Sequence, residues 1–306
     1  EIKNRFKKSN TTNLQRFFEK KKQNLIYKYK EINLYIRSNN NMKIKSSHLL
    51  ATVIIVNYNN AKYIIPCLES IFNQKYKKIE IIVVDDQSTD NSIEILKKFQ
   101  KKIKIIRTDK KIGKGSFNQM YGYLCGLKKS NGQIVFFLDS DDYFKRNKIY
   151  KIMSDFKKNK KLRIIYDLPI KKFLNKKVKI YNKNISSNNY WPYIPPTSCI
   201  AIKRTELIKI YNLVNFKMFP DIWLDFRIGI VAKYIWDDLN IKNEHLTYYR
   251  QSEKNISSNF VFLSSNWWKR RKEAHAYMMY FFLKNKIKYK KNYDYFITSI
   301  VNFFIT

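Results

Sequence analysis

The segment that most constrains this chain is Ile134–Asp142, in which five apolar residues are followed at once by Asp-Ser-Asp-Asp. An apolar run without polar interruption predicts a β-strand buried on both faces of a sheet. Carboxylates crowded at the end of such a strand repel one another unless a cation lies among them. Hard divalent ions such as Mg²⁺ or Mn²⁺ prefer oxygen ligands and often share them with substrate phosphates. An ordinary acidic turn is the alternative interpretation.

The residues before this segment alternate between strand and helix patterns. Ala51–Val56 and Ile79–Val84 have the composition of buried strands, and Ile103–Ile106 predicts a short third strand. Apolar residues at helical spacing lie between them, and Asn118–Leu127 predicts a helix before the fourth strand. This alternation predicts an α/β fold, with a mostly parallel central sheet flanked by helices and ligands bound outside the carboxyl ends of the strands.

The loops after the predicted strands exclude two common nucleotide-binding motifs. Asn57–Asn60 follows the first strand and contains no glycine, whereas a dinucleotide-binding Rossmann domain needs a glycine-rich turn there. Gly113–Ser116 lacks the spacing of a phosphate-binding P-loop. A second acidic run, Asp85–Asp90, ends the second strand. The phosphates of a ligand would therefore be held through a metal ion rather than by backbone amides.

Composition indicates a globular protein with a sizeable core, since the chain has 306 residues and 44% hydrophobic content. A formal net charge of +37 is typical of proteins that bind nucleic acid or anionic membranes, but the lysines are spread through every segment. Cys67, Cys125 and Cys199 are scattered without metal-ligand spacing, which predicts reduced thiols in a cytoplasmic protein. We find no apolar stretch of the ~18 residues that a membrane span needs.

The chain is predicted to have three regions. Residues 1–47 form a basic helical extension, residues 48–255 form the α/β domain, and residues 256–306 form a basic aromatic helical region. The α/β domain divides into a first half, 48–145, and a second half, 146–255. The boundaries follow changes in composition, because Lys and aromatic residues at helical spacing dominate both ends.

Two interpretations of the terminal regions stay open. In the first interpretation, the helices of both regions pack on the main domain. In the second, they bind another surface, and for residues 1–47 that surface is a membrane or a partner protein. The segment Trp267–Lys288 combines aromatic residues with a basic cluster, a composition that also suits the surface of a membrane. We therefore expect packing elements and keep peripheral membrane contact as the second hypothesis.

Two segments, Val53–Ser92 and Gly132–Asp142, resemble the nucleotide-sugar-binding half of the inverting glycosyltransferases of family two, which have the GT-A fold. The resemblance covers roughly residues 50 to 255. It implies transfer of a sugar from a nucleotide-diphospho-sugar, UDP-sugars being favoured, to an acceptor hydroxyl, with Mn²⁺ or Mg²⁺ as cofactor. The acceptor would be a glycan or a lipid-linked molecule in the synthesis of cell-surface glycan, lipopolysaccharide, lipooligosaccharide or capsule.

The resemblance also assigns the donor site. Tyr58 and Asp86 match the residues that hold the nucleotide base, and Lys114 compensates for an arginine that the family normally carries before the fourth strand. Physically, a carboxylate can accept a hydrogen bond from a base N–H, and a tyrosine ring can pack on the base. Their alternative role is that of ordinary turn residues.

The acidic segment and one arginine would bind the rest of the donor. Asp139 matches the residue that binds the ribose, and Asp141 and Asp142 match the ligands of the metal that bridges the diphosphate. Arg250 matches a clamp on the diphosphate, although an ordinary surface arginine is the alternative.

The second half of the domain would bind the acceptor and supply the catalytic base. Asp221 matches the family's catalytic aspartate, although Pro220 stands where a glutamate is usual. A plain helix start at Pro220-Asp221 would also explain both residues. Asp225 lies one helical turn further on and is the second candidate for the base.

A different class of function is a basic binding protein without catalytic activity, built on a degenerate glycosyltransferase fold, which would bind nucleic acid or an anionic membrane surface. A nucleic-acid groove would be lined with Lys and Arg and would not gather Asp86 and the Asp139–Asp142 acids at one edge of a sheet. We therefore expect an enzyme with no nucleic-acid partner.

Overall fold

The computed structural model describes residues 49–113, 115–173, 176–180, 193–213, 218–251, 260–289 and 291–305. All of them belong to one unit, His48–Thr306. The helical extension expected over residues 1–47 and the candidate residue Lys114 lie outside the described residues, so both stay predictions.

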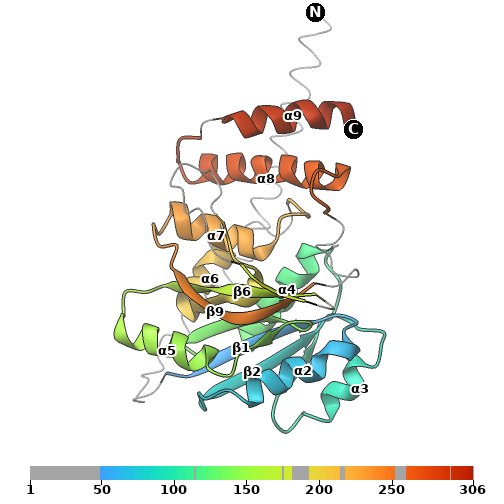
Figure 1. Cartoon of the computed structure of the whole chain (residues 1–306), viewed down its shortest axis with the longest axis vertical. Coiled ribbons are helices and arrows are strands. Elements are labelled where there is room, and N and C mark those ends of the chain that lie inside the picture. Colours follow the sequence, from blue (N-terminus) through green and yellow to red (C-terminus); the bar gives the residue numbers. More distant parts are fainter. Residues whose placement is uncertain are drawn as a thin grey trace, which may run out of the picture. The chain divides into compact units, whose positions relative to one another are not determined.

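Strands and helices alternate through the first half of this unit (Figure 1). In chain order they are β1 (Ala51–Asn57), α2 (Ala61–Phe72), β2 (Ile79–Asp85), α3 (Ser92–Lys97), β3 (Lys104–Arg107), α4 (Ser116–Lys129), β4 (Ile134–Asp139), β5 (Tyr143–Phe144) and α5 (Lys148–Lys158). The second half contains β6 (Ile164–Lys172), β7 (Lys177–Lys179), a short 3₁₀ helix (Thr197–Cys199), β8 (Ile200–Lys203), α6 (Arg204–Leu213), α7 (Leu224–Tyr234), β9 (Ile241–Arg250), α8 (Ser265–Lys284) and α9 (Tyr293–Ile305).

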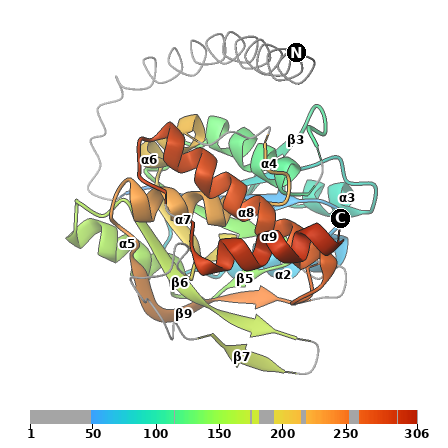
Figure 2. The ribbon, with the colours of Figure 1, turned by 90° about the horizontal axis from the view of Figure 1, so that it is seen from above.

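The described strands form one sheet in the order β3-β2-β1-β4-β8-β6-β9-β5, and β7 pairs with β6 at its side (Figure 2). The first four strands are parallel, as the alternating pattern predicts. β8 then joins β4 in the antiparallel direction, and β6 pairs antiparallel with β8. The expected α/β fold with a central sheet flanked by helices is confirmed, and its second half mixes both strand directions.

Helices cover both faces of the sheet because alternate residues of its central strands point to opposite sides. In β1, Ile54 and Val56 pack toward α4, α6, α7 and α8, whereas Val53 and Ile55 pack toward α2, α3 and α5. All of these strand residues are buried, and so are the apolar residues of β4. This double burial explains why both strands are continuous apolar runs in the sequence.

The register of the parallel strands places their carboxyl ends at one edge of the sheet. Asn57 of β1 pairs with Asp85 of β2, and Val56 of β1 pairs with Asp139 of β4. The two acidic segments that the sequence places after β2 and β4 therefore meet on either side of the loop after β1.

The C-terminal helices α8 and α9 form an antiparallel pair (Figure 1). The inner side of α8 belongs to the main core, where Tyr277, Met278, Phe281 and Phe282 are buried. These residues lie within Trp267–Lys288, so much of the aromatic content of that segment serves packing. Among the helices that the structure describes, none combines the length and the apolar character that crossing a membrane requires.

Candidate active site

Asp139 ends β4 and is held by helix α4. The side chains of Gln119 and Tyr123 each donate a hydrogen bond of 2.8 Å to the same carboxylate oxygen, Asp139 Oδ1. Gln119 and Tyr123 are four residues apart, so they lie on one face of the helix. Burial raises the pKa of Asp139, and the two hydrogen bonds oppose that shift. The orientation of this carboxylate is therefore set before any ligand binds.

A glycine lets α4 come close enough to hold Asp139. A Cβ atom added to Gly126 would lie 2.4 Å from Ile54 Cγ2 of β1, so any side chain at this position would push helix and sheet apart. Tyr123 packs edge-to-face on Phe137, with ring centroids 4.7 Å apart. The close packing of α4 on β1 and β4 thus places the Tyr123 hydroxyl within hydrogen-bond distance of the Asp139 carboxylate.

Arg250, the last residue of β9, is bonded to the acidic turn after β4. Its backbone N–H donates to Asp142 Oδ1 at 2.8 Å, and its Nε–H donates to the backbone carbonyl of Asp141 at 2.8 Å. The guanidinium also lies 4.5 Å from the ring centroid of Tyr63. The structure thus brings Arg250 together with Asp141 and Asp142.

Asp141 follows in the same acidic turn and is partly exposed. Burial, and then the nearby charge of Asp139, raise the pKa of Asp141 to about 7, while Arg250 opposes the shift. Asp142 is almost wholly buried, and its Oδ2 atom has no hydrogen-bond partner within the described part of the chain. Burial, Asp141 and Asp139 raise the pKa of Asp142 well above its usual range.

These acids fit a divalent cation that is shared with a substrate. In the described ranges, no three His, Cys, Asp or Glu side chains converge as a complete metal site. Asp141 and the free Oδ2 atom of Asp142 nevertheless offer hard oxygen ligands whose ionised form a cation would favour. Mg²⁺ and similar ions commonly take one or two carboxylates and complete their shell with phosphate oxygens and water.

Tyr58 and Asp86 directly follow the paired strand residues Asn57 and Asp85, and the Asp86 N–H donates to the Asn57 carbonyl at 2.8 Å. Tyr58 is half exposed, and the ammonium of Lys111 lies 3.8 Å from its ring centroid. Asp86 is almost buried and accepts a hydrogen bond of 2.9 Å from the Thr108 hydroxyl. Burial raises the pKa of Asp86, and the Thr108 hydrogen bond and Lys111 oppose the shift. An exposed ring next to a partly desolvated carboxylate suits recognition of a nucleotide base.

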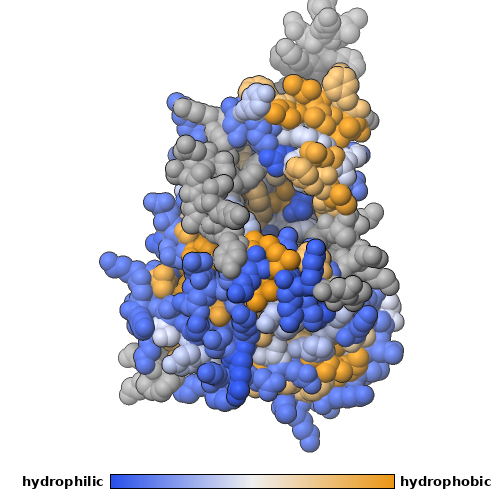
Figure 3. All heavy atoms as spheres, viewed as in Figure 1, coloured by the Kyte–Doolittle hydropathy of each residue, from blue (hydrophilic) through white to orange (hydrophobic). Residues whose placement is uncertain are grey.

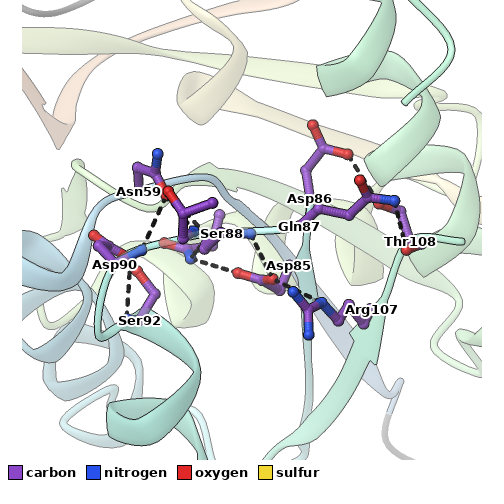
Figure 4. A network of polar contacts seen from close by, with 11 residues as sticks. Asn59, Asp85, Asp86, Gln87, Ser88, Asp90, Ser92, Arg107 and Thr108 are labelled. Atoms are coloured by element: carbon purple, nitrogen blue, oxygen red, sulfur yellow. Dashed lines mark hydrogen bonds and ion pairs between the residues drawn. The ribbon is translucent and has the colours of Figure 1, made fainter. Parts of the chain in front are cut away.

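Asp85 has a structural task that the sequence does not reveal. Consecutive strand residues point to opposite sides, and Figure 4 shows Asp85 turned away from Asp86. Asp85 accepts hydrogen bonds from the Asn57 side chain and from the Ser88 backbone N–H, both at 3.0 Å. These bonds tie the loop after β2 to the end of β1. The alternation of side chains along a strand predicts that Asp85 and Asp86 point to opposite sides, but it does not predict the bonds that Asp85 makes.

Asn59 continues this loop connection with its side chain. Its Oδ1 atom accepts the backbone N–H of Thr89 at 2.7 Å, and its backbone has a positive φ of 51° (Figure 4). Asn tolerates this conformation better than most residues other than Gly. The loop that carries Tyr58 is thus fixed to the loop that carries Asp86.

Helix α7 begins after Asp221 and just before Asp225. The alternative explanation of Pro220-Asp221 as a plain helix start does not hold, because α7 begins at Leu224. Arg227 explains the difference. Its guanidinium donates to the backbone carbonyls of residues 218, 219 and 222, and Phe219 has a positive φ of 67°. These bonds hold the segment before α7 in a non-helical conformation, with Asp221 in the turn and Asp225 in the first helical turn.

Asp225 lies close enough to Asp139 for the charge of Asp139 to affect its pKa. Burial raises the pKa of Asp225 to about 6, Asp139 adds to the shift, and Arg270 opposes it. Arg270 itself lies 3.8 Å from the ring centroid of Trp223, on the turn before α7. A carboxylate with a pKa between 6 and 7 is suited to general base catalysis at neutral pH.

Asp221 is held from α8 by a residue that the sequence did not indicate. The backbone N–H of Asp221 donates a hydrogen bond of 2.7 Å to Glu273 Oε2. Burial raises the pKa of Glu273 to about 7, with a further contribution from the charge of Asp221. Glu273 is the single acidic residue of the basic segment between Arg271 and Lys288. This isolated acid is the sequence feature that could have pointed to a specific role for Glu273.

A buried ion pair lies below the acidic turn. Lys148 Nζ lies 2.6 Å from Asp167 Oδ1, and both side chains are fully buried. The same ammonium donates to the Ser198 carbonyl at 2.7 Å and to the Thr247 hydroxyl at 2.6 Å. Ser198 Oγ in turn accepts the backbone N–H of Asp139 at 3.0 Å. This network connects the second half of the sheet to the end of β4.

The remaining sequence predictions concern structural residues. The three cysteines are free thiols, and Cys67 and Cys199 are buried.

Comparisons with known proteins identify the family of the chain. Residues 52–220 match the family model described as Glycosyl transferase family 2. An uncharacterized glycosyltransferase from Nostoc sp. is 30% identical over 215 residues, which are 65% of this chain and 64% of that protein. The Escherichia coli glucosyltransferase WfaP, named for UDP-Glc and a GlcNAc-diphosphoundecaprenol, is 40% identical over 100 residues, 33% of this chain and 38% of that protein.

A solved structure confirms the fold. The mannosyltransferase PcManGT from Pyrobaculum calidifontis, in complex with GDP-Man and Mn²⁺, aligns with a TM-score of 0.53 and 16% identity. The alignment covers 91% of this chain and 79% of that one. The model match alone spans more than half of the chain, and the acidic edge of the sheet lies within it. The chain belongs to glycosyltransferase family 2.

Proposed function

We propose that this family member is a metal-dependent inverting glycosyltransferase that moves a sugar from a nucleotide-diphospho-sugar to an acceptor hydroxyl. The observation that carries the proposal is the meeting of Asp141, Asp142 and Arg250 at the carboxyl edge of the sheet, beside the loops of Tyr58 and Asp86. A cationic clamp next to two carboxylates, one of which has an oxygen atom without a hydrogen-bond partner among the described residues, suits a diphosphate bound through a cation.

Asp141 and Asp142 would hold the ion, Mn²⁺ or Mg²⁺. Such an ion stabilises the charge that develops on the departing nucleoside diphosphate. The PcManGT structure contains Mn²⁺, which supports the same ion class here. Arg250 would orient the diphosphate by its guanidinium, which is already fixed by its bond to the Asp141 carbonyl.

Tyr58 and Asp86 would bind the nucleotide base, and Asp139 the ribose. A uracil N3–H can donate to the Asp86 carboxylate, and the half-exposed Tyr58 ring can stack on the base. UDP-sugars are therefore the favoured donors, in agreement with the donor for which WfaP is named.

We assign the catalytic base to Asp221, with Asp225 as the second candidate. An inverting transfer needs a carboxylate that takes the acceptor proton on the side of the sugar opposite the leaving group. Asp221 matches the family position and is held in the turn before α7 by Glu273. The later start of α7 and the pKa of about 6 favour Asp225.

The acceptor would be a glycan or a lipid-linked molecule. WfaP is named for a diphosphoundecaprenol acceptor, which supports this class. An enzyme that uses such an acceptor together with a nucleotide sugar would work at the cytoplasmic face of a membrane, in peripheral contact with it, in the synthesis of surface glycans.

A screen of nucleotide-sugar hydrolysis in the presence of Mn²⁺ tests the proposal. We expect slow release of the nucleoside diphosphate from one UDP-sugar and little release from GDP-sugars. The double variant Asp141→Asn/Asp142→Asn is the control and should release none. If neither UDP-sugars nor GDP-sugars are bound or hydrolysed by the folded protein, the alternative of a non-catalytic binding protein takes its place.

A further inference from the structure

We propose that the outer face of α9 is a membrane-docking surface that inserts its aromatic side chains into an anionic lipid bilayer. The proposal deepens the expected membrane contact of the enzyme. It assigns that contact to Tyr293–Ile305 instead of Trp267–Lys288. The proposal rests on the distribution of polar and apolar residues between the two faces of α9.

The buried face of α9 is polar. Thr298 and Asn302 are 1% and 0% exposed, and they lie one helical turn apart. The Asn302 amide donates a hydrogen bond of 3.0 Å to the Trp268 carbonyl of α8 and one of 2.8 Å to the Thr298 carbonyl. In a helix of a water-soluble domain, the face turned toward the protein is normally the apolar one.

The charged residue of α9 also points inward. Asp294 accepts hydrogen bonds from the Arg271 side chain, with Nε at 2.8 Å, and its other oxygen lies 2.7 Å from His275 Nε2. Asp294, Thr298 and Asn302 are spaced by four residues, so together they form a polar stripe against α8.

The outer face of α9 is correspondingly apolar and aromatic. Its exposed large apolar residues are Tyr293 (81%), Phe296 (53%), Ile300 (59%), Phe303 (79%) and Phe304 (79%), and the small Ser299 is exposed among them. These positions recur at helical spacing and therefore form one stripe. Figure 3 shows apolar groups gathered over this end of the molecule. A stripe of large apolar side chains open to water marks an interaction surface.

A second apolar group lies at the same end. The bond from Asn302 to Trp268 places the C-terminal end of α9 beside the N-terminal end of α8 (Figure 1). The loop just before α8 exposes Val261, Phe262 and Leu263, which are 66%, 71% and 55% accessible. The exposed loop lies close in sequence to Trp268, which α9 contacts.

Charge identifies the partner as an anionic lipid surface. Residues 260–306 contain nine Lys and Arg residues and two acids, Glu273 and Asp294. Both acids face inward, since Glu273 bonds to Asp221 and Asp294 to Arg271. Lys286, Lys288 and Lys291 are exposed just before α9. Aromatic residues flanked by exposed lysines, with no outward carboxylate in the described part of this region, suit the headgroup boundary of an anionic bilayer.

Co-sedimentation of the full chain with vesicles tests the proposal. The vesicles consist of phosphatidylcholine alone or of phosphatidylcholine mixed with phosphatidylglycerol. We expect binding to the mixed vesicles and at most weak binding to the neutral ones. The variant Phe303→Gln/Phe304→Gln should lose about tenfold or more in affinity for the mixed vesicles, because two large apolar groups no longer enter the bilayer.

The matched control is Tyr150→Gln, which removes a 56% exposed aromatic side chain from α5. It should bind vesicles like the unaltered protein. The triple variant Lys286→Gln/Lys288→Gln/Lys291→Gln should reduce the preference for phosphatidylglycerol. Circular dichroism and the urea midpoint show whether each variant is folded. If a variant loses its fold, Phe303→Ser and Phe304→Ser are measured singly in its place.

Three results would overturn the proposal. One is the absence of binding to the mixed vesicles, and another is equal binding by the Phe303→Gln/Phe304→Gln variant. The third is a self-association in solution that this variant abolishes while vesicle binding is absent, which would make the face an interface between copies of the chain. The assay contains no donor sugar, so its outcome is independent of whether the proposed transfer reaction exists.

Discussion

The backbone N–H of Arg250 donates a hydrogen bond of 2.8 Å to Asp142 Oδ1, which joins the end of β9 to the acidic turn after β4. A second bond runs from Arg250 Nε to the Asp141 carbonyl. The backbone bond survives any substitution of the side chain, whereas the second bond does not. The role of the guanidinium can therefore be tested without breaking the connection between the two strands.

The first prediction concerns Arg250. Arg250→Ala should keep the fold and reduce donor affinity by about tenfold or more, because it removes a charge-assisted contact to the diphosphate. Arg250→Lys should recover part of the loss, since it keeps the charge but not the forked geometry. Titration calorimetry with the nucleoside diphosphate measures both. Arg163→Ala is the matched control, because Arg163 also bonds to a backbone carbonyl but lies at the far edge of the sheet. Equal affinity in Arg250→Ala would remove Arg250 from the donor site.

The second prediction separates the two candidate bases. Asp221→Asn should retain donor affinity and lose about 10²–10⁴-fold in transfer rate, the usual contribution of a general base. Asp225→Asn should then retain most of the rate. Both variants are measured for donor binding and for single-turnover transfer. An active Asp221→Asn beside an inactive Asp225→Asn that still binds the donor would assign the base to Asp225.

The pH profile provides an independent check on that assignment. A general base must be deprotonated, and burial raises the pKa of Asp225 to about 6. If Asp225 is the base, the rate should fall about tenfold per pH unit below pH 6 and level off above it. A profile that stays flat down to pH 5 would exclude Asp225.

The third prediction concerns Glu273 as a positioning residue for Asp221. Glu273→Gln retains a carbonyl oxygen that can accept the Asp221 N–H, so the rate at pH 8 should stay within a few fold of the unaltered enzyme. Glu273→Leu leaves this N–H without its acceptor, and a loss of about tenfold in kcat is expected.

The charge of Glu273 predicts a further difference. Its pKa of about 7 means that the side chain becomes an anion as the pH rises through 7, which strengthens its hydrogen bond from the Asp221 N–H. The transfer rate of the unaltered enzyme should therefore rise as the pH passes through 7. The rate of Glu273→Gln should lack this rise. If Glu273→Leu has an unchanged kcat and changes only the urea midpoint, the residue is purely structural.

The fourth prediction concerns the buried ion pair. Lys148→Met should lower the free energy of unfolding by about 3–5 kcal/mol, because it leaves the Asp167 charge buried without its partner. The double variant Lys148→Met/Asp167→Leu should recover much of the loss, since no uncompensated charge remains. Urea denaturation measures both. A single variant that is as stable as the unaltered protein would contradict the assigned role of the pair.

Sequence patterns predicted the parallel part of the fold well. β1, β2 and β4 are each buried on both faces, and their continuous apolar runs are the direct signature of that environment. The position of the acids at the carboxyl edge followed from strand direction alone. Tyr58, Asp86 and Asp139–Asp142 lie at this edge, as the strand pattern predicts.

Contacts between distant segments could not be predicted in this way. The bond between Asp142 and Arg250 depends on the pairing of β5 with β9, which a single sequence does not encode as a local pattern. Glu273 reaches Asp221 only because α8 packs on α7. The start of α7 is set by Arg227, a residue inside the helix, through bonds to carbonyls before it. Tertiary contacts here override the local preference of Pro and Asp for a helix start.

Helix α9 is a different case. Its polar and apolar stripes are visible in the sequence, but the sequence does not show which stripe is turned toward the protein. Asp294, Thr298 and Asn302 are spaced as a polar stripe, and an ordinary amphipathic helix would turn such a stripe outward. The structure turns it toward α8, which leaves the aromatic residues exposed.

The most direct test of the account is the dependence of donor binding on Asp141 and a divalent cation. Calorimetric titration of UDP into the unaltered protein should show an affinity at least about tenfold higher with Mn²⁺ than with excess chelator. Asp141→Asn, which keeps the size of the side chain, should bind UDP with the weaker affinity in both conditions. An unaltered protein that binds UDP equally well with Mn²⁺ and with chelator, or an Asp141→Asn variant with the full effect of Mn²⁺, would contradict the account.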